Sequence, residues 1–519
     1  MPSRKQPAQN ARSVAWGALD EHRRTGRFLA PLLDERAVDA RLSAADRRLA
    51  LELANGVLRR RNTLDAILVP HVRRSKEKVE ERLWTLLQLG AYQLALLDSI
   101  PVHAAVDETV RLARNFGEPR WAGFVNGVLR GVARTVTNEV ADRPSASAVP
   151  LATASIGFRP NRDRGSAVAE FARIPTHHPR GHGILANSAT HEMDAAGAVG
   201  KYRLLSVPVF PEPAADPAGY FAEAFSFPPW LVRRWIDRYS FEALLTLGFQ
   251  FDSPPPIVLR VNRLRTTRDD FLASLDAGGI AAEPGEHPAA VRLLAPAKID
   301  ALPGYAEGCF VVQDATAMAV CDLLAPQPGE TILDLCAAPG TKTTYLAELM
   351  GDAGTIVAVD ASADRLALVE ENVRRLALSS VTTRRIDRDG GDIPAGPFDA
   401  VLVDAPCSNT GVLGRRPEAR WRLSPDDLRE LPALQSRLLR DALSRLKPGG
   451  RAVYATCSIE PEENGDVVRA ALADFEDCEL VEGATTFPGE PSDGGYRALI
   501  RRSYDRGAEI PVCRELGVT

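Results

Sequence analysis

Ile332-Leu-Asp-Leu-Cys-Ala-Ala-Pro-Gly-Thr-Lys342 is an apolar run that ends in a turn of small residues, with a helical pattern after it. This order predicts a strand, a loop and a helix. In an α/β sheet such a loop binds nucleotide-like ligands, because small residues let the backbone approach the ligand and the helix N-terminus offers free N–H groups. The loop is neither a Walker A loop nor a Gly-x-Gly-x-x-Gly loop, since its order is Gly340-Thr341-Lys342.

Strand-like runs alternate with helical patterns on both sides of this loop. Helical patterns, for example at 365–376 and 434–446, separate the runs. The alternation over residues 315–503 predicts a doubly wound, mostly parallel sheet. The predicted strands are Thr331–Leu335, Thr355–Val359, Val381–Ile386, Ala400–Val403 and Arg451–Ala455.

Acidic residues end the two strands that follow the loop. Asp360 lies 26 residues after Asp334, the spacing of one βαβ unit, and a carboxylate there can accept both hydroxyls of an unphosphorylated ribose. A helix N-cap is the competing interpretation of Asp360, and the spacing favours the ribose. Asp387 closes the third strand, where it could contact an adenine, and Asp389 competes for that role.

Two later strands end in cysteines. Val401-Leu-Val-Asp-Ala-Pro-Cys407 carries Asp404 and Cys407 to the carboxyl edge of the sheet, and Val453-Tyr-Ala-Thr-Cys-Ser458 carries Cys457 to the same edge. A lone cysteine at a strand end is usually a small buried hydrophobe. Two of them on separate strands, beside an aspartate on the ligand side, indicate a shared chemical role.

The N-terminal quarter of the chain has a helical pattern over residues 9–134. Ser43 followed by Asp46 predicts an N-cap, and apolar residues recur at helical spacing after it. Residues 1–140 carry a net charge of +7 within a chain of net charge −5, so the rest carries −12. A basic segment on an acidic body favours a polyanionic partner only weakly, because an ordinary solvated helical surface explains the charge equally well.

Composition divides the chain into four predicted segments. In order they are an all-α domain, a Pro-, Ala-, Gly- and Ser-rich insertion or linker, a small α+β unit and the strand–helix domain. Their expected bounds are 9–139, 140–221, 222–313 and 314–505. The insertion holds four of the eight histidines, namely His177, His178, His182 and His191. Since no cysteine accompanies them and their spacing is not of a zinc type, we expect surface histidines and no metal.

Composition also limits the class of protein. No stretch approaches the roughly 20 consecutive apolar residues of a membrane span, and the first ten residues contain no apolar signal core. We therefore expect neither a membrane protein nor a secreted one. The seven cysteines are an odd number confined to the C-terminal 40% of the chain, which favours free thiols in the cytoplasm over disulfides.

Three C-terminal motifs resemble one enzyme family. They are Leu-Asp-Leu-Cys-Ala-Ala-Pro-Gly-Thr-Lys (333–342), Asp-Ala-Pro-Cys-Ser-x-Thr-Gly (404–411) and Thr-Cys-Ser-Ile-x-Pro-Glu-Glu-Asn (456–464). They are similar to motifs of the S-adenosylmethionine-dependent RNA cytosine-C5 methyltransferases, the NOL1/NOP2/Sun family. Thr341 departs from the family's pattern, where a second glycine is common, and Asp493-Gly-Gly-Tyr496 is less aromatic than usual.

Three N-terminal segments resemble the antitermination factor NusB. They are Leu-Ser-Ala-Ala-Asp-Arg-Arg-Leu-Ala (42–50), Asn-Gly-Val-Leu-Arg-Arg-Arg (55–61) and Phe-Val-Asn-Gly-Val-Leu-Arg (124–130). The two resemblances together cover residues 12–135 and 222–503. The 140–220 segment is longer than the usual linker in such fusions.

The methyltransferase resemblance implies a cofactor site and a covalent mechanism. Carbon-5 of cytosine is a poor nucleophile until a thiolate adds at C6, which explains a need for sulfur. By resemblance, Cys457 is the nucleophile, Cys407 assists release of the adduct, and Asp404 hydrogen-bonds the cytosine N3/N4 edge. The residues themselves leave the order of the two cysteines open. The implied S-adenosyl-L-methionine-binding residues are Cys336, Ala337, Ala338, Pro339, Gly340, Thr341, Lys342, Asp360, Arg365, Asp387 and Asp404.

The resemblances also imply a fold and a substrate. We expect a multidomain protein with an all-α NusB-like domain, a small α+β RNA-recognition unit and an α/β Rossmann-like class I methyltransferase domain. The expected substrate is a cytosine of 16S rRNA, bound by a cytoplasmic monomer before full subunit assembly, with no DNA or membrane partner. A tRNA substrate stays open. Intact motifs argue against a non-catalytic NusB-like RNA-binding factor, and the cysteine pair argues against methylation of nitrogen or oxygen.

Overall fold

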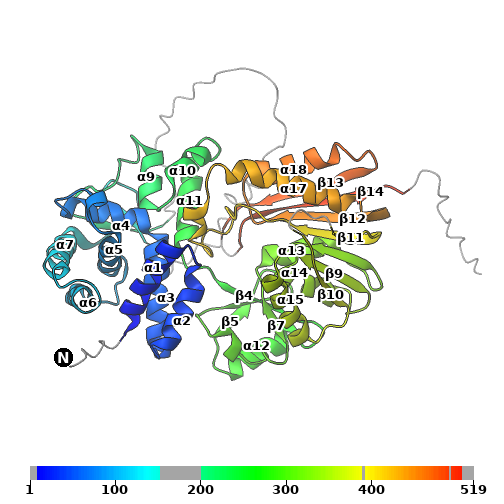
Figure 1. Ribbon diagram of the computed structural model, residues 1–519, viewed down its shortest axis with the longest axis horizontal. Coiled ribbons are helices and arrows are strands. Elements are labelled where there is room, and N and C mark those ends of the chain that lie inside the picture. Colours follow the sequence, from blue (N-terminus) through cyan, green and yellow to red (C-terminus); the bar gives the residue numbers. More distant parts are fainter. Residues whose placement is uncertain (1–8, 152–199, 388–391, 490–491, 505–519) are drawn as a thin grey trace, which may run out of the picture. The chain divides into compact units, whose positions relative to one another are not determined.

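The computed structural model describes residues 9–151, 200–387, 392–489 and 492–504 (Figure 1). The four histidines of the predicted insertion and Asp389 lie outside these ranges. Two compact units share the described chain. The first contains the residues up to 255 together with 413–422, and the second contains 256–412 and the residues from 423 onward. No helix in the described ranges is long and apolar enough to cross a membrane.

The N-terminal part of the first unit is built mainly of helices. They are α1 (Ala11–Thr25), α2 (Leu29–Asp39), α3 (Ala44–Arg59), α4 (Arg61–Leu68), α5 (Glu81–Leu96), α6 (Val102–Asn115) and α7 (Trp121–Thr135). The predicted N-cap is confirmed, since Ser43 Oγ accepts the Asp46 N–H of α3 at 3.1 Å. α5 is buried along almost its whole length, because its neighbouring helices cover it on every side.

A small antiparallel sheet follows α7, in a region where the sequence showed no sustained periodicity. Its strands are β1 (Val136–Ala141), β2 (Ala148–Pro150) and β3 (Tyr202–Leu205), in the order β1-β3-β2. Strands of three to six residues are too short for their alternation to stand out in a sequence. Three helices follow and end this part of the unit, namely α9 (Pro217–Ala224), α10 (Pro229–Ile236) and α11 (Phe241–Asp252).

A buried ionic cluster incorporates segment 413–422 into the first unit. Arg420 of α16 (Ala419–Arg422) lies 3.1 Å from Asp252 Oδ1, at the end of α11. Arg60 lies 2.7 Å from the other oxygen, Oδ2, and all three side chains are buried. The Arg420 guanidinium also stacks over the Phe227 ring at 4.1 Å. A short segment that interrupts the sequence of the second unit thus completes the core of the first.

The second unit begins with a four-stranded antiparallel sheet. Its strands are β4 (Ile257–Val261), β5 (Ala282–Pro284), β6 (Ala290–Leu293) and β7 (Phe310–Val312), in the order β5-β6-β4-β7, and α12 (Arg268–Ala277) packs on them. Arg260 of β4 is buried, and its guanidinium donates to the Thr341 carbonyl and to Glu348 Oε1, both at 2.7 Å. These bonds fix the small sheet to the helix that follows the 336–340 loop.

A seven-stranded sheet forms the rest of the second unit (Figure 1). The strands are β8 (Thr331–Leu335), β9 (Thr355–Asp360), β10 (Val381–Arg385), β11 (Phe398–Asp404), β12 (Leu446–Thr456), β13 (Cys478–Thr486) and β14 (Gly495–Arg502), in the order β10-β9-β8-β11-β12-β14-β13. β8 to β12 are parallel, as predicted. β14 runs antiparallel to both β12 and β13. We did not predict this last pair, because the exposed strand β13 lacks a regular apolar alternation.

Helices cover both faces of this sheet. They are α13 (Ala315–Leu324), α14 (Thr341–Leu349), α15 (Ala363–Leu376), α17 (Asp427–Leu443) and α18 (Gly465–Leu472). α17 and α18 share a core with one face of the sheet, and α13 and α14 share a core with the other. The strand order reverses between β8 and β11, since β9 lies on the far side of β8. In doubly wound sheets the crevice at such a reversal is where ligands bind.

The ionic cluster of Arg420 gives a prediction about stability. Arg420→Met should destabilise the first unit by about 3–5 kcal/mol, because removing one member of a buried ionic group leaves the others incompletely paired. Urea unfolding, with hydrogen exchange read in α3 and α11, measures the effect. Arg429→Met is the control, since Arg429 is exposed and pairs only at the surface with Asp426. If both variants unfold at the wild-type urea concentration, the cluster contributes no net stability.

Candidate active site

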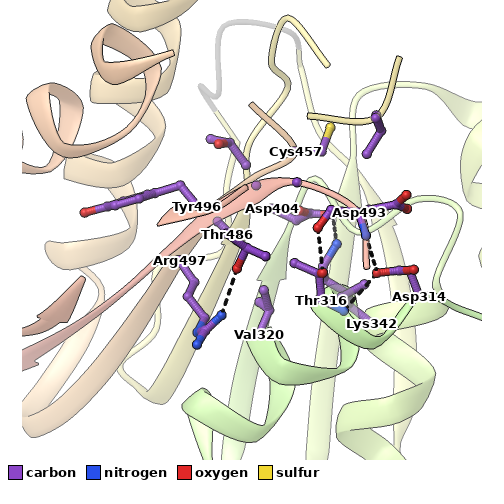
Figure 2. A pocket seen from close by; sticks show the side chains of 16 residues that line it. Asp314, Thr316, Val320, Lys342, Asp404, Cys457, Thr486, Asp493, Tyr496 and Arg497 are labelled. Carbon is purple, nitrogen blue, oxygen red and sulfur yellow. Dashed lines mark hydrogen bonds and ion pairs between the residues drawn. The ribbon is translucent and has the colours of Figure 1, made fainter. Parts of the chain in front are cut away.

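The candidate site lies at the carboxyl ends of β8, β11 and β12 in the second unit. A cavity of about 80 Å³ opens at this edge, and Figure 2 shows the side chains that line it. They come from α13, α14, β11, β12, β13 and β14 and from the loops beside them, and include Lys342, Asp404 and Cys457. No group of three or more side chains suited to a metal ion occurs in the described part of the chain.

The 336–340 loop makes a tight turn between β8 and α14. Cys336 has φ +67° and Gly340 has φ +93°, both in the left-handed region. A Cβ atom at Gly340 would lie 3.0 Å from Val369 Cγ1 and 3.1 Å from Val369 Cα, so glycine is needed for the close approach of α15. The Ala337 N–H donates to the Val359 carbonyl at 3.0 Å, which holds the loop against β9.

Asp360, at the end of β9, faces this loop. Its side chain is only 4% exposed; Oδ1 accepts the Ser362 N–H at 3.0 Å and Oδ2 accepts the Ala338 N–H at 3.3 Å. Arg365 lies 3.3 Å from Oδ2 and donates to the Ala338 carbonyl at 2.6 Å. The N-cap of α15 is Ser362, so helix capping does not account for Asp360. The structure therefore brings Asp360, Ala338 and Arg365 together.

Asp387 lies farther along the same edge of the sheet. Arg385 of β10 pairs in register with Asp360, so Asp387 is two residues beyond the end of β10. Asp387 is exposed, and its N–H donates to Asp392 Oδ1 at 2.7 Å. Because Asp389 lies outside the described residues, the choice between Asp387 and Asp389 stays a prediction.

Asp334 is a buried carboxylate on β8 that was not predicted as a site residue. Thr343 Oγ1 donates to Asp334 Oδ2 at 2.6 Å, and Oδ1 has no hydrogen-bond partner among the described residues. Burial raises the pKa of Asp334 to about 7. An acidic residue inside an otherwise apolar strand was the sequence signal that pointed to it.

Lys342 and Asp404 form an ion pair on the cavity wall (Figure 2), with Lys342 Nζ 2.6 Å from Asp404 Oδ2. Burial lowers the pKa of Lys342, but the charge of Asp404 and the hydrogen bond to it outweigh burial, so the pKa is raised overall. Lys342 is therefore a cation. Lys342 was predicted to belong to the cofactor loop, and its amine contacts the carboxylate of Asp404 at the end of β11.

Cys407 and Cys457 are in contact with one another. Their Sγ atoms are 3.1 Å apart, and the Cys457 thiol donates to Asn409 Oδ1 at 3.3 Å. The hydrogen bond with Cys457 and burial both raise the pKa of Cys407. Asn409 has φ +63°, and its Nδ2 donates to the Cys407 carbonyl at 2.8 Å. Asn409 was not predicted as a site residue, although asparagine is enriched at left-handed positions and its place two residues after Cys407 was a signal.

Comparisons with known proteins address the chain as a whole. Residues 321–496 match the family described as 16S rRNA methyltransferase RsmB/F, 9–134 match the NusB family, and 227–300 match the ferredoxin-like domain of RsmF/B-like methyltransferases. Ribosomal RNA small subunit methyltransferase B of Salmonella paratyphi B is 33% identical over 507 residues, which are 95% of this chain and 98% of that protein. The chain belongs to the ribosomal RNA small subunit methyltransferase B family.

Two further similarities extend over nearly the full length. The methyltransferase B of Serratia proteamaculans is 34% identical over 509 residues, 95% of this chain and 99% of that protein. The crystal structure of PH0851 has the same fold, with a TM-score of 0.68, 21% identity, and coverage of 96% of this chain and 100% of that one. Membership of the methyltransferase B family confirms the NusB-like and methyltransferase resemblances and the predicted multidomain fold.

The raised pKa of Asp334 predicts how stability depends on pH. In the unfolded chain an aspartate has a pKa of about 3.9, so the folded protein binds more protons between roughly pH 4 and pH 7. Stability due to protonated Asp334 is complete below about pH 4 and is lost as the pH rises to about 7. Asp334→Asn should remove this loss. The free energy of unfolding of the variant, relative to that of the wild type, should therefore increase by a few kcal/mol between pH 4 and pH 8.

Denaturant unfolding of both proteins across that pH range measures the difference. Asp364→Asn is the control, since Asp364 is an exposed aspartate on α15 and should change stability in parallel with the wild type. If the wild type and Asp334→Asn also change in parallel, Asp334 is ionised throughout and the assigned pKa is wrong.

Proposed function

We propose that this protein methylates carbon-5 of a cytosine in 16S rRNA, using S-adenosyl-L-methionine and a covalent adduct between Cys457 and C6. The contact between the Cys407 and Cys457 sulfurs carries the proposal, because Cys457 lines the same cavity as Asp404. Nitrogen and oxygen atoms are nucleophilic already, so their methylation needs no thiol pair. Membership of a small-subunit rRNA methyltransferase family supports rRNA as the substrate.

Residues 336–342, Asp360, Arg365, Asp387 and Asp404 are the proposed cofactor site. When bound, S-adenosylmethionine supplies a methyl group on a positively charged sulfur. The small-residue loop and the buried Asp334 Oδ1 suit a ligand of this kind, since one provides close backbone approach and the other an unsatisfied acceptor. Asp360 holds two ribose hydroxyls, because each carboxylate oxygen can accept more than one hydrogen bond. Arg365 orients Asp360 and the Ala338 carbonyl.

The cofactor site gives a binding prediction. Asp360→Ala should weaken S-adenosylmethionine binding at least tenfold, which is about 1.4 kcal/mol, because both ribose hydroxyls lose their acceptor. Isothermal titration calorimetry measures the dissociation constant. Asp364→Ala removes an exposed carboxylate four residues along the chain and should bind as the wild type does. Unchanged affinity in Asp360→Ala would remove Asp360 from the site.

The two thiols have different proposed roles. Cys457 adds as a thiolate to C6, which makes C5 nucleophilic enough to accept the methyl group. Cys407 stays protonated, since its pKa is raised, and can donate its S–H to the Cys457 thiolate. After methyl transfer a water molecule accepts the C5 proton, the electron pair of the C5–H bond re-forms the C5–C6 double bond, and the Cys457 sulfur departs as a thiolate. Cys407 assists that release.

Asp404 and Lys342 position the base. Asp404 hydrogen-bonds the cytosine N3/N4 edge and stabilises the protonated adduct. Lys342 Nζ donates to Asp404 Oδ2. Asp404 Oδ1 has no hydrogen-bond partner among the described residues and can therefore face the substrate. The ion pair thus orients the carboxylate before the base arrives, which lowers the cost of binding it.

The RNA around the target cytosine binds to residues outside the cavity. The target cytosine leaves its stack to reach the cysteines, while the NusB-like helices and the β4–β7 sheet bind the surrounding RNA by phosphates and shape. We propose that the protein acts as a cytoplasmic monomer on rRNA before full subunit assembly, without DNA or membrane partners. A tRNA substrate is the second candidate, and a non-catalytic NusB-like factor is the third.

Bisulfite sequencing with cysteine variants tests this function. A deletion strain should lose one bisulfite-resistant cytosine in 16S rRNA, and the wild-type gene should restore it. Cys457→Ser should not restore it and should form no RNA adduct, because a hydroxyl is far less nucleophilic than a thiolate. Cys407→Ala should form the adduct and release it slowly, giving an RNA–protein band on a denaturing gel. Cys478→Ser, at the start of β13, is the control and should restore methylation.

Each other outcome contradicts a specific part of the proposal. Loss of a resistant cytosine in tRNA, with 16S rRNA unchanged, would replace the substrate. An adduct seen only with the Cys457 variant would show that Cys407 is the nucleophile and that Cys457 assists release. Activity in both variants without any adduct would rule out the covalent mechanism, and no change in either RNA would favour the non-catalytic factor.

A further inference from the structure

Glu463 is a buried carboxylate that binds both cysteine-bearing segments. It ends the short helix η5 (Pro461–Glu463), and its relative exposure is 0%. Oε1 accepts the Ser408 N–H at 2.8 Å, and Oε2 accepts hydrogen bonds from Ser408 Oγ and Ser458 Oγ. Ser408 follows Cys407 and Ser458 follows Cys457, so one carboxylate group contacts the residue next to each cysteine.

Buried hydroxyl groups extend this link. Ser408 Oγ lies 3.1 Å from Ser458 Oγ, which lies 3.1 Å from Thr410 Oγ1. Thr410 Oγ1 accepts the Ile459 N–H at 3.0 Å. Gln435 of α17 adds a third element, since its Nε2 donates to Glu463 Oε1 at 3.0 Å and to the Pro406 carbonyl at 2.9 Å. Together these hydrogen bonds join the two cysteine-bearing segments to one another, to Glu463 and to α17.

The network begins where the sheet ends. The last register pair between β11 and β12 is Asp404–Ala455, so both cysteines lie beyond the parallel ladder. Past that point the Gly411 N–H donates to the Cys457 carbonyl at 2.9 Å, the Cys457 thiol donates to Asn409 Oδ1, and the Glu463 network adds further hydrogen bonds between the two segments. Sheet pairing alone therefore does not set the distance between the two sulfurs.

The environment of Glu463 is unfavourable for a charge. Burial raises the pKa of Glu463, while hydrogen bonds from Ser408, Ser458 and Gln435 oppose the rise. Among the described residues no lysine or arginine forms an ion pair with it. A buried carboxylate satisfied only by neutral donors costs stability compared with an apolar side chain, which indicates that its hydrogen bonds serve a purpose other than stability. Glu463 does not line the cavity, so that purpose is indirect.

We propose that Glu463 is a positioning residue that holds the Cys407 and Cys457 sulfurs at their contact distance and thereby sets the rate of methyl transfer. It acts through Ser408 and Ser458 and touches neither substrate nor cofactor. The proposal about rate rests on the proposed function, whereas the proposal about sulfur geometry can be tested in the free protein. The two experiments therefore fail independently.

The geometric test is the rate of disulfide formation in the full-length protein. Diamide, an azo compound, accepts two electrons and two protons as the Cys407 and Cys457 thiols join, and peptide mass spectrometry follows the Cys407–Cys457 product. Glu463→Ala should form this disulfide at least tenfold more slowly than the wild type, and Glu463→Gln should lie between them because it keeps one acceptor. Glu348→Gln is the matched control, since Glu348 is a buried carboxylate of the same unit paired with Arg260. It should oxidise at the wild-type rate.

The kinetic test separates positioning from binding. Glu463→Ala should lower kcat roughly tenfold to a hundredfold, because small displacements of reacting groups have effects of that size. The KM values for RNA and cofactor should change less than twofold. A lower kcat in Glu463→Ala, together with a kcat in Glu463→Gln that lies between those of Glu463→Ala and the wild type, supports the proposal. Equal falls in kcat and cofactor affinity would assign Glu463 a general structural role and overturn it.

A second variant keeps the proposal testable if Glu463→Ala does not fold. Ser408→Ala with Ser458→Ala removes both hydroxyl donors and leaves the carboxylate, so disulfide formation should again slow at least tenfold. Wild-type oxidation rates in every folded variant would overturn the geometric proposal. If the variants oxidise slowly but the wild type itself methylates no RNA, the geometric proposal stands and the proposed function is overturned.

Discussion

The hydrogen-bond register between β8, β11 and β12 brings to one edge of the sheet the strand ends that lead to Asp404, Cys407 and Cys457. Val403 of β11 pairs with Leu335 of β8, and Asp404 pairs with Ala455 of β12. Because side chains alternate along a strand, a shift by one residue would turn each of them to the opposite face. The buried residues on both faces prevent such a shift, since each face has its own apolar core. Packing throughout the sheet thus fixes the site at its edge.

Strand ends were predictable from sequence, whereas tertiary partners were not. Asp360, Cys407 and Cys457 each follow an apolar run, so their common edge follows from the parallel topology alone. Glu463 and the 413–422 segment lack such a signal, because their places depend on donors and carboxylates far away in the sequence. Short or exposed strands such as β2 and β13 were missed for a related reason. β2 is too short and β13 too exposed for apolar and polar residues to alternate along them.

Three carboxylates near the site are stabilised in three different ways. Asp404 pairs with a lysine, Glu463 is satisfied by neutral donors, and Asp334 keeps one oxygen without a partner among the described residues. Each arrangement leaves a different amount of negative charge for a ligand. The ion pair is close to neutral but leaves Asp404 Oδ1 for another donor, the hydrogen-bonded carboxylate is enclosed, and Asp334 has a buried oxygen with capacity for one more hydrogen bond. These charges are not independent, because the charge of Asp404 raises the pKa of Asp334 and the charge of Lys342 lowers it.

Segment 413–422 has a consequence for how the protein is made. Ribosomes release a chain from its N-terminus, and domains generally fold in that order. The first unit departs from this scheme, because Asp252 can form its ion pair with Arg420 only after another 168 residues have been synthesised. Until then Arg60 is the one arginine of the cluster that pairs with Asp252 in the nascent first unit, and the core of that unit is incomplete. Translation must pass β11 before the N-terminal half can mature, so neither half of the protein finishes folding before most of the other has been made.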